Sequence, residues 1–219
     1  MNGTVSAFQW REFDVASQLP ADWTTEILAL VSQASRRRTL VATSVTSREA
    51  TRNIQIPVET VGGDIVRREL PWLFSLYEGL FLRLGQTCVS DTLAPATRDR
   101  YAINLNVQRG THMRYECHVD SNPLEGLLYV TSHPQGAGGE LVVSNSTTAL
   151  GPEAINVDCV RIFPREGTLV FFDARQHPHY VAPLRDDRDV RVVVAMNYYT
   201  PRCSEAHRPA DLDKHLGLV

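Results

Sequence analysis

Apolar and polar positions change their spacing near residue 100, and this change divides the chain into two regions. In the first region, apolar residues recur at helical spacing after Asp22, a residue type that caps helices, so we predict a helix that ends near Gln33. A second helix is predicted from Pro71 to Gly85, because proline suits the first helical turn and glycine suits a C-terminal stop. This second segment is apolar on nearly all sides, so we expect it to be buried.

From residue 101 the pattern becomes that of β-strands. Residues 101–108 alternate, which places apolar and polar side chains on opposite faces, because the side-chain period of a strand is two. The apolar face carries Tyr101, Ile103, Leu105 and Val107, and the polar face carries Asn104, Asn106 and Gln108. Further β-type runs lie at 126–132, 139–144, 160–164, 167–172, 179–184 and 190–199. Short strands at such spacing predict an antiparallel sandwich or jelly roll, with the preceding helices covering one sheet.

The length of 219 residues is compatible with one compact domain, and we predict a single domain spanning 1–219. Residues 1–100 are expected to form a helical support region that is irregular between its helices, apart from one short strand at 54–58. Residues 101–200 are expected to form the jelly-roll core, and 201–219 a polar tail that acts as a lid or a loosely held end. The predicted fold class is mainly β with α.

Composition and charge exclude several classes of protein. The formal net charge is −3 and the basic run Arg36–Arg38 reads as a solvated helix end, so no nucleic-acid partner is indicated. No apolar stretch reaches the roughly 20 residues that span a bilayer, and the first residues lack the pattern of a signal peptide. The 4 cysteines lie far apart without a C-x-x-C pair, which fits reduced thiols in a cytoplasmic protein better than structural zinc or disulfides. The oligomeric state is left open.

The strongest chemical signal is the sequence His118-Val119-Asp120. On a strand, H-x-D points both side chains to one face, where an imidazole and a carboxylate can take adjacent positions on one metal ion, while Cys117 points to the other face. A third ligand has to come from elsewhere, and His177 and His179 are both available at the start of a later β-run. Two histidines and one carboxylate form the facial triad of non-haem iron(II) oxygenases. H-x-D alone is a weak signal, because it occurs often by chance in solvated loops.

Arg191 places a charge at the start of the apolar run 190–199. A buried guanidinium needs an anionic partner, because an unpaired buried charge is costly, and arginine forks readily onto a carboxylate. The simpler interpretation is an ion pair with one of the aspartates in the preceding turn, LRDDRD.

Between Tyr101 and Tyr199 the chain resembles the prolyl-4-hydroxylase-like branch of the iron(II)/2-oxoglutarate dioxygenases. The motifs that carry the likeness stand in the order typical of the family: His118-Val119-Asp120, Leu127-Leu128-Tyr129-Val130, Gly138-Gly139-Glu140-Leu141, His179-Tyr180-Val181-Ala182-Pro183-Leu184 and Arg191. The likeness favours His179 over His177 as the third ligand, because the V-x-P pattern follows His179 and Arg191 then stands at the family's spacing. It also implies the family's fold, a double-stranded β-helix (jelly roll) core with N-terminal supporting helices.

The resemblance implies cofactors and a reaction as well. His118, Asp120 and His179 would hold Fe(II), and Arg191 would pair with the distal carboxylate of 2-oxoglutarate. With O2 as the other cosubstrate, the expected reaction is hydroxylation of an unactivated C–H bond, with succinate and CO2 as co-products. The short chain and the polar face of 101–108 favour a small polar substrate, such as a free amino acid.

Polar residues that share a face with these groups are candidates for further contacts. Asn104 and Asn106 are expected to face the cosubstrate. Arg114 and Glu116 share strand parity with His118, and Asn197 shares parity with Arg191, so these three are expected to contact the substrate.

Other functions remain open. Desaturation or cyclisation would use the same residues, whereas halogenation is disfavoured because Asp120 fills the position that chloride takes in related halogenases. A zinc hydrolase would show H-E-x-x-H, which is absent. A cupin would show H-x-H with a downstream Glu and His, and no glutamate follows His177-Pro178-His179 before Glu205. A non-enzymatic β-sandwich that binds a ligand would leave the H-x-D, the spaced histidine and the strand arginine unexplained.

Overall fold

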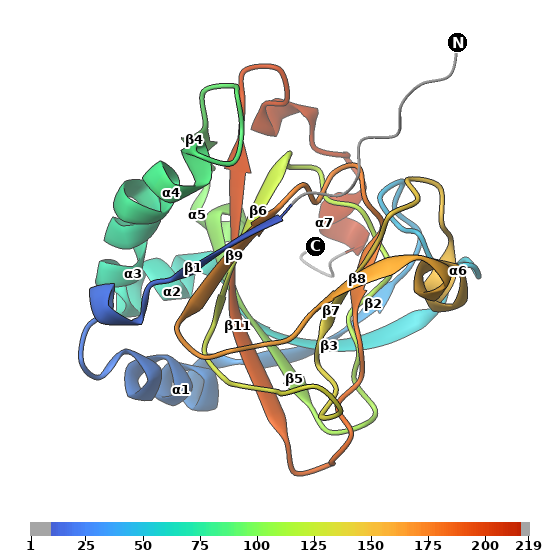
Figure 1. Cartoon of the computed structure of the whole chain (residues 1–219), viewed down its shortest axis with the longest axis horizontal. Coiled ribbons are helices and arrows are strands. Elements are labelled where there is room, and N and C mark those ends of the chain that lie inside the picture. The colour runs from blue at the N-terminus through green and yellow to red at the C-terminus, as the bar shows by residue number, and fades with distance from the viewer. Residues whose placement is uncertain (1–9, 216–219) are drawn as a thin grey trace.

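The computed structural model describes residues 10–215, which form two antiparallel sheets with helices on one side (Figure 1). The large sheet has the strand order β1-β9-β6-β11-β5-β3-β2, with β4 paired to β11, and the small sheet has the order β10-β7-β8. The strands are β1 (Trp10–Asp14), β2 (Arg36–Val41), β3 (Gln55–Val61), β4 (Ala94–Pro95), β5 (Ile103–Arg109), β6 (Leu124–Tyr129), β7 (Leu141–Ser144), β8 (Cys159–Ile162), β9 (Thr168–Phe172), β10 (His179–Val181) and β11 (Val190–Tyr199). This is the predicted jelly roll.

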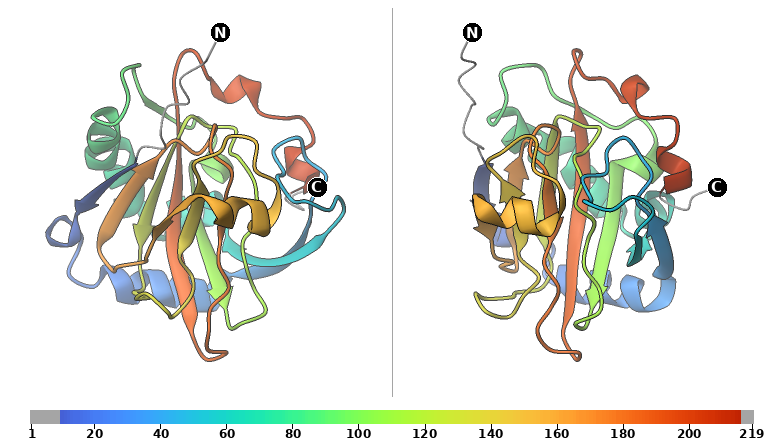
Figure 2. Two further views of the ribbon diagram at one scale, coloured as in Figure 1. Left: turned by 45° about the vertical axis from the view of Figure 1, so that its right-hand side comes forward. Right: turned by 90° about the vertical axis from the view of Figure 1, so that its right-hand side faces the viewer.

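The helices lie mainly before β5 and cover the outer face of the large sheet (Figures 1 and 2). They are η1 (Ala16–Gln18), α1 (Trp23–Ala34), α2 (Gly63–Glu69), α3 (Pro71–Leu76), η2 (Tyr77–Phe81), α4 (Leu82–Gln86), α5 (Asp99–Ala102), α6 (Gly151–Val157), η3 (Glu205–His207) and α7 (Leu212–His215). No helix within residues 10–215 is long and apolar enough to cross a membrane. All 4 cysteines are free thiols.

Both predicted helices are present. The segment from Pro71 runs through α3, η2 and α4 to Gln86, with a π-helical turn at Tyr77–Phe81. Helix α1 begins directly after Asp22, although the Asp22 side chain makes no capping hydrogen bond. Tyr77 ties the long segment to the sheet, because its hydroxyl donates to the Asn197 carbonyl at 2.6 Å.

The large sheet separates two apolar cores. On its outer face, Ile103, Leu105 and Val107 of β5 pack into the cluster that also contains the buried side chains of α1, α3 and η2. The inner face packs against the small sheet through a second cluster, which includes Leu127, Tyr129, Leu141, Val143, Ile162, Val170, Phe172, Val181, Val193 and Ala195. The alternation in β5 therefore has the predicted meaning: its apolar face meets the helices, and its polar face turns toward the space between the sheets.

The first hundred residues contribute more strand than predicted. Strands β1, β2 and β3 all join the large sheet, and β3 runs from Gln55 to Val61 where only 54–58 was expected. The Arg36–Arg38 run lies in β2, so its interpretation as a helix end is wrong. Strands β1 and β2 are the edges of the sheet, and charged side chains are common on edge strands because they discourage pairing with other chains. Such edges show little apolar alternation in their sequence.

Charged groups join β2, β3 and β5. The Glu59 carboxylate accepts hydrogen bonds from Ser35 at 2.6 Å, from Arg37 at 3.2 Å and from Arg109 at 3.0 Å. Burial acts to raise the pKa of Glu59, but these hydrogen bonds outweigh it, and the pKa is lowered.

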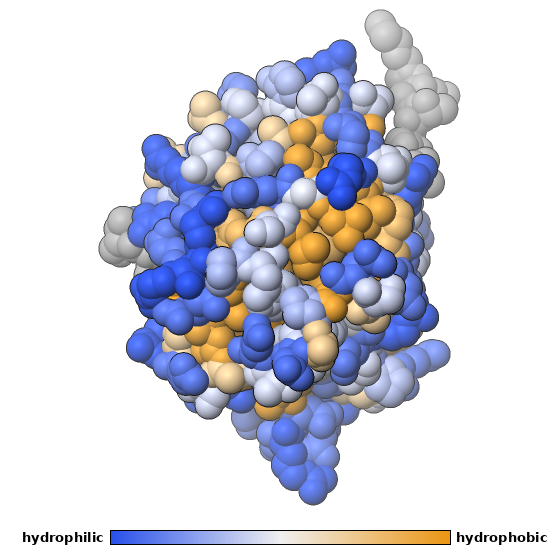
Figure 3. Space-filling view, turned by 90° about the vertical axis from the view of Figure 1, so that its left-hand side faces the viewer, coloured by the Kyte–Doolittle hydropathy of each residue, from blue (hydrophilic) through white to orange (hydrophobic). Residues whose placement is uncertain are grey.

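The described part of the C-terminal tail is held against the barrel opening. Glu205 accepts a hydrogen bond from the Thr97 backbone at 2.8 Å, and Asp213 accepts one from the Tyr101 hydroxyl at 2.7 Å. The segment thus lies across one end of the space between the sheets (Figure 2). Figure 3 shows the opposite flank, where apolar surface lies between polar side chains. Trp10 of β1 and Leu28 of α1 are exposed apolar residues.

Candidate active site

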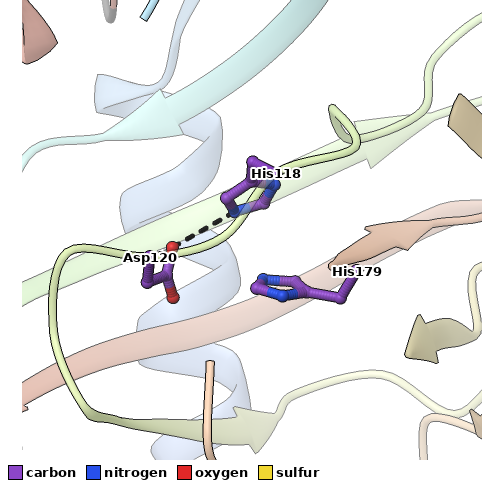
Figure 4. Close-up of side chains that lie close together, drawn as sticks. All are labelled: His118, Asp120 and His179. Atoms are coloured by element: carbon purple, nitrogen blue, oxygen red, sulfur yellow. Dashed lines mark ion pairs between the residues drawn. The ribbon is translucent and has the colours of Figure 1, made fainter. Parts of the chain in front are cut away.

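Three side chains from distant parts of the chain meet between the sheets. Ligand atoms of His118, Asp120 and His179 all lie within 4.8 Å of one another. Figure 4 shows the two rings and the carboxylate pointing toward a common centre, with His118 and Asp120 on one loop and His179 at β10. Two imidazoles and one carboxylate on one side of a centre leave positions open for further ligands.

The backbone that holds His118 and Asp120 is a loop, and not the strand that the sequence predicted. His118 forms an isolated bridge with His179, with both N···O distances at 2.9 Å, and the Asp120 amide donates to the Ala174 carbonyl at 2.8 Å. These bonds impose local strand geometry, so both side chains still point to one face. Cys117 points away and is buried in a separate apolar cluster, as predicted.

Backbone carbonyls set the orientation of both imidazoles. Nδ1 of His118 lies 2.7 Å from the Glu116 carbonyl, and Nδ1 of His179 lies 3.0 Å from the His177 carbonyl. A carbonyl only accepts, so each Nδ1 carries a proton and each Nε2 faces the common centre. This is the arrangement that metal-bound histidines use.

The electrostatics of the centre show how closely its groups interact. Burial acts to lower the pKa of His118, but the hydrogen bond with Asp120, at 3.2 Å, outweighs it and raises the pKa to about 9. Burial and the neighbouring His118 lower the pKa of His179 to about 4. Burial acts to raise the pKa of Asp120, yet the hydrogen bond and charge of His118 lower it. Nε2 of His179 and Oδ2 of Asp120 are buried without a hydrogen-bond partner among the described residues, which suits a cation at the centre.

His177 does not join the three. It is buried, and its Nδ1 lies 2.9 Å from the Ser144 carbonyl. Because Pro178 separates two residues of equal strand parity, sequence alone could not choose between them. The structure brings His179 to the centre and leaves His177 outside it.

Arg191 lies deeper between the sheets. Its side chain is 2% exposed, and its Nε and Nη2 have no hydrogen-bond partner within residues 10–215. Its guanidinium carbon is 5.5 Å from the ring centre of Tyr129, whose hydroxyl is also buried without a described partner. The aspartates of the preceding turn do not pair with it, since Asp186 pairs with Arg188. A buried cation beside an unsatisfied hydroxyl fits the carboxylate end of an anionic ligand.

The glycines of the predicted G-G-E-L motif make room for this arginine. Gly139 has φ +75°, a left-handed conformation that favours glycine, and a Cβ atom there would lie 3.1 Å from Cδ of Arg191. At Gly138, with φ +81°, a Cβ atom would lie 2.2 Å from the Pro183 carbonyl oxygen. Both positions therefore need glycine for the backbone, and Gly139 also for the packing against Arg191.

A pocket of about 470 Å³ opens beside the metal-ligand centre. Several residues that the sequence singled out line it, namely Asn104, Asn106, Glu116, His118, Asp120 and Asn197. Arg114 is not among the lining residues, because its guanidinium is paired with Glu49 at 2.7 Å. That pair also fixes the loop before the H-x-D, since Glu49 accepts from the Cys117 amide at 2.7 Å.

Sequence reasoning missed several lining residues, among them Arg36, Arg38, Tyr115 and Glu125. Tyr115 lies in an irregular segment, and its ring centre is 5.9 Å from that of His118. Glu125 lies on β6 and lines the pocket together with Asp120. Burial and the adjacent Asp120 carboxylate raise the pKa of Glu125 well above its ordinary range. Its strand parity with Leu127 and Tyr129 could have placed it on the inner face.

Comparison with known proteins agrees with this geometry. Residues 98–199 match the family model described as the 2OG-Fe(II) oxygenase superfamily. A search of curated proteins gave no match.

Solved structures with the same fold include three with TM-scores near 0.6. HygX from Streptomyces hygroscopicus is 10% identical with a TM-score of 0.61, covering 91% of this chain and 86% of its own. AviO1 from Streptomyces viridochromogenes Tue57 is 13% identical with a TM-score of 0.61, covering 90% and 92%. A prolyl hydroxylase from Trichoplax adhaerens is 18% identical with a TM-score of 0.59, covering 88% and 84%. At these identities, the likeness concerns the fold.

The family's cofactors, Fe(II) and 2-oxoglutarate, fit the groups described above. The His118-Asp120-His179 centre offers the donor set for iron, and the buried Arg191 and Tyr129 offer an unsatisfied cation and hydroxyl for a carboxylate. The jelly roll and the His118-Asp120-His179 centre agree with the match of residues 98–199 to the model of the 2OG-Fe(II) oxygenase superfamily.

Proposed function

We propose that this chain hydroxylates an unactivated C–H bond of a small polar molecule, with free amino acids as the first candidates, and forms succinate and CO2 alongside the product. One observation carries the proposal. The two-histidine, one-carboxylate centre faces a pocket of about 470 Å³ whose wall holds Asn104, Asn106, Glu116 and Asn197. Such a volume suits a small molecule, and the polar wall suits a substrate that forms hydrogen bonds.

In this proposal each group has a defined task. His118, Asp120 and His179 hold Fe(II), and Arg191 pairs with the distal carboxylate of 2-oxoglutarate while Tyr129 donates a hydrogen bond to it. The metal with its bound cosubstrate supplies the oxidising chemistry with O2. The chain itself orients the ligands: backbone carbonyls hold both Nε2 atoms toward the metal, and the apolar cluster between the sheets keeps water from the cosubstrate.

The polar residues of the pocket divide into two groups. We propose Asn104 and Asn106 for the cosubstrate side, and Asn197 and Glu116 for the substrate side, because all four line the pocket. Arg114 is better explained as a structural partner of Glu49. The motif order from His118 to Arg191 supports the prolyl-4-hydroxylase-like branch, and the HygX structure holds nickel, 2-oxoglutarate and hygromycin B, a small polar molecule.

The test has two stages. Anaerobic addition of Fe(II) and 2-oxoglutarate should give a weak visible charge-transfer band, and the band should be absent from the His179→Ala variant. Free amino acids and other small polar molecules are then screened for succinate formation above the background rate, and products are identified by mass. Gain of one oxygen atom supports hydroxylation, whereas loss of two hydrogen atoms indicates desaturation or cyclisation. Absence of the band in the wild type would refute the proposed function.

A further inference from the structure

We propose that residues 204–215 form a lid over the substrate pocket, which opens to admit ligands to the metal centre and is latched shut by Asp213. The inference rests on the proposed function, because it concerns access to the same pocket. It adds a gate that controls how fast ligands enter and leave.

The lid supplies part of the pocket wall. Arg208 and Leu212 line the pocket, and the Arg208 guanidinium lies over the ring of Tyr101, which lines it from α5. Because two lining side chains come from the lid, the pocket has this wall only while the lid is closed. His118 and Asp120 line the same pocket, so a ligand that reaches the metal through it passes the lid.

The fixed side of the pocket mouth belongs to the sheet and the helices. Arg36 and Arg38 of β2, Asp64 of α2 and Arg100 of α5 line the same pocket. Arg38 donates a hydrogen bond to the Thr60 hydroxyl of β3, within the sheet. These groups stay in place when the lid moves, so the mouth keeps charges of both signs on its fixed side.

The lid is held to the rest of the protein by polar contacts. Among the side chains described for residues 204–214, none is buried and none belongs to an apolar cluster of the core. Glu205 accepts a hydrogen bond from the Thr97 amide at 2.8 Å, and Asp211 accepts one from the Ser44 hydroxyl at 3.4 Å. Partly exposed polar contacts contribute little to stability, so a segment held by them opens locally while the core stays folded.

These polar contacts converge on Asp213. Its carboxylate accepts hydrogen bonds from the Tyr101 hydroxyl at 2.7 Å and from Arg208 at 2.9 Å, and Arg100 lies 3.7 Å away. Tyr101 and Arg100 belong to α5, whereas Arg208 belongs to the lid. Asp213 therefore joins the end of the lid to α5 and holds Arg208 against the pocket. It is not itself a lining residue, so its effect on a bound ligand is indirect.

A turn after β11 marks where the lid leaves the sheet. The backbones of Thr200 and Cys203 exchange two hydrogen bonds, at 3.2 and 3.0 Å, directly before the lid. The Cys203 thiol also donates to the Ser121 carbonyl at 3.4 Å, which keeps the turn attached to the loop after Asp120. A lid that opens therefore pivots at Ser204.

A competing role is purely structural: the segment is a fixed strap, and ligands reach the metal without its moving. The two roles differ in their kinetics. When the latch of a gate is weakened, the association and dissociation rates of a ligand that the gate does not touch rise by the same factor. Its Kd stays nearly unchanged, because the gate has no preference between the free and the bound protein. A fixed strap leaves both rates as in the wild type.

The probe is 2-oxoglutarate, whose binding to the anaerobic Fe(II) protein is followed by stopped flow through the charge-transfer band. Asp213→Asn removes the charge of the latch, and both rates should rise about three- to tenfold, as expected for a weakened, partly exposed charged contact. Kd should change by about twofold at most. Asp64→Asn is the matched control, because it removes an acid from the fixed side of the mouth. It should raise only the association rate of the 2-oxoglutarate dianion, since a rim charge acts on approach.

Hydrogen exchange gives a second readout, which needs no ligand. The amides of His207, Arg208 and Leu212 donate hydrogen bonds within the lid. In Asp213→Asn they should exchange faster by a similar factor, while the amides of β5 and β11 keep their wild-type rates. Tyr101→Phe keeps the ring under Arg208 but loses the hydroxyl of the latch. It should show the same pattern, and it carries the test if Asp213→Asn does not fold.

Unchanged rates in the latch variants would overturn the proposal. So would a rise in the association rate alone, or faster exchange spread equally over the lid and the strands. If the wild type gives no charge-transfer band with 2-oxoglutarate, the proposed function fails. If the band is normal and the latch variants keep wild-type rates, only the lid fails.

Discussion

Replacing Arg191 with alanine should weaken 2-oxoglutarate binding without removing the metal. The side chain is 2% exposed and its Nε and Nη2 have no partner among the described residues, so a carboxylate that reaches it forms a dry ion pair. Loss of one partner from a buried charge pair costs about 2–5 kcal/mol, much of it because the other charge is left unpaired. At 1.4 kcal/mol for each factor of ten, Kd for 2-oxoglutarate should rise roughly 30-fold to several-thousand-fold.

The structure favours the upper part of that range. Tyr129 would remain beside the carboxylate, but a single neutral hydroxyl replaces little of a fork-shaped cation. Arg191→Lys should recover only part of the loss, because lysine keeps the charge and not the two-pronged geometry. Tyr129→Phe should cause a smaller loss than Arg191→Ala, since a neutral hydrogen bond contributes less than a charged one.

The assay is an anaerobic titration of the Fe(II) protein with 2-oxoglutarate, followed through the charge-transfer band. Arg188→Ala is the matched control, because Arg188 precedes the same strand but is exposed and pairs with Asp186 at 2.8 Å. The wild type should also discriminate sharply against 2-oxo acids that lack the distal carboxylate, and Arg191→Ala should discriminate much less. Equal Kd values for the Arg191 and Arg188 variants would refute the reasoning and make Arg191 a structural residue of the core.

Three further predictions follow from the geometry. His179→Ala should lose its iron after reconstitution while His177→Ala keeps it, by metal analysis; the reverse order would move the ligand. Gly139→Ala should lower stability by roughly 1–3 kcal/mol in thermal unfolding, through its φ of +75° and the 3.1 Å approach to the buried arginine. Gly136→Ala, with nothing within 4 Å, tests the conformational strain alone. The pKa of Glu59 is lowered in the fold, so its carboxylate stabilises the protein above the ordinary value of 4.5, and this contribution is lost as the pH falls below it. The unfolding free energy of Glu59→Gln should therefore depend less on acid pH than that of the wild type.

The inner strands could be predicted from the sequence because the two faces of each strand lie in different environments, which produces a regular alternation of side chains. In β5, one set of side chains packs on the helices and the other lines the pocket, so Asn104 and Asn106 are on the face that the alternation indicated. The same regularity placed the H-x-D side chains together, even though the backbone at His118 is a loop held by a bridge and not a full strand. The side chains of His118 and Asp120 still lie on one face in this loop, because the bridge keeps the backbone extended.

Edge strands and ion pairs were the parts that sequence could not resolve. Arg36 and Arg37 of β2 are exposed and only Leu40 of this strand is buried, so its pattern carries little information about a sheet that buries mainly its centre. Arg114 has the strand parity expected for a substrate contact, but it pairs with Glu49, which is 65 residues away in the sequence. An ion pair between such distant residues leaves no local sequence pattern from which it could be predicted. Contacts between distant segments decide which polar residues are left for ligands.

The two faces of the large sheet explain how a small protein can keep buried charges beside its active site. The outer face is packed by α1, α3, η2 and α4 over a continuous apolar cluster, which fixes the positions of β5, β6 and β11. Arg191 and Glu125 project from the opposite face of those same strands, so their backbones are set by packing in which neither side chain takes part. Burial of the Arg191 charge is unfavourable until an opposite charge arrives. Because the sheet fixes the position of Arg191, that cost makes the space between the sheets selective for an anion.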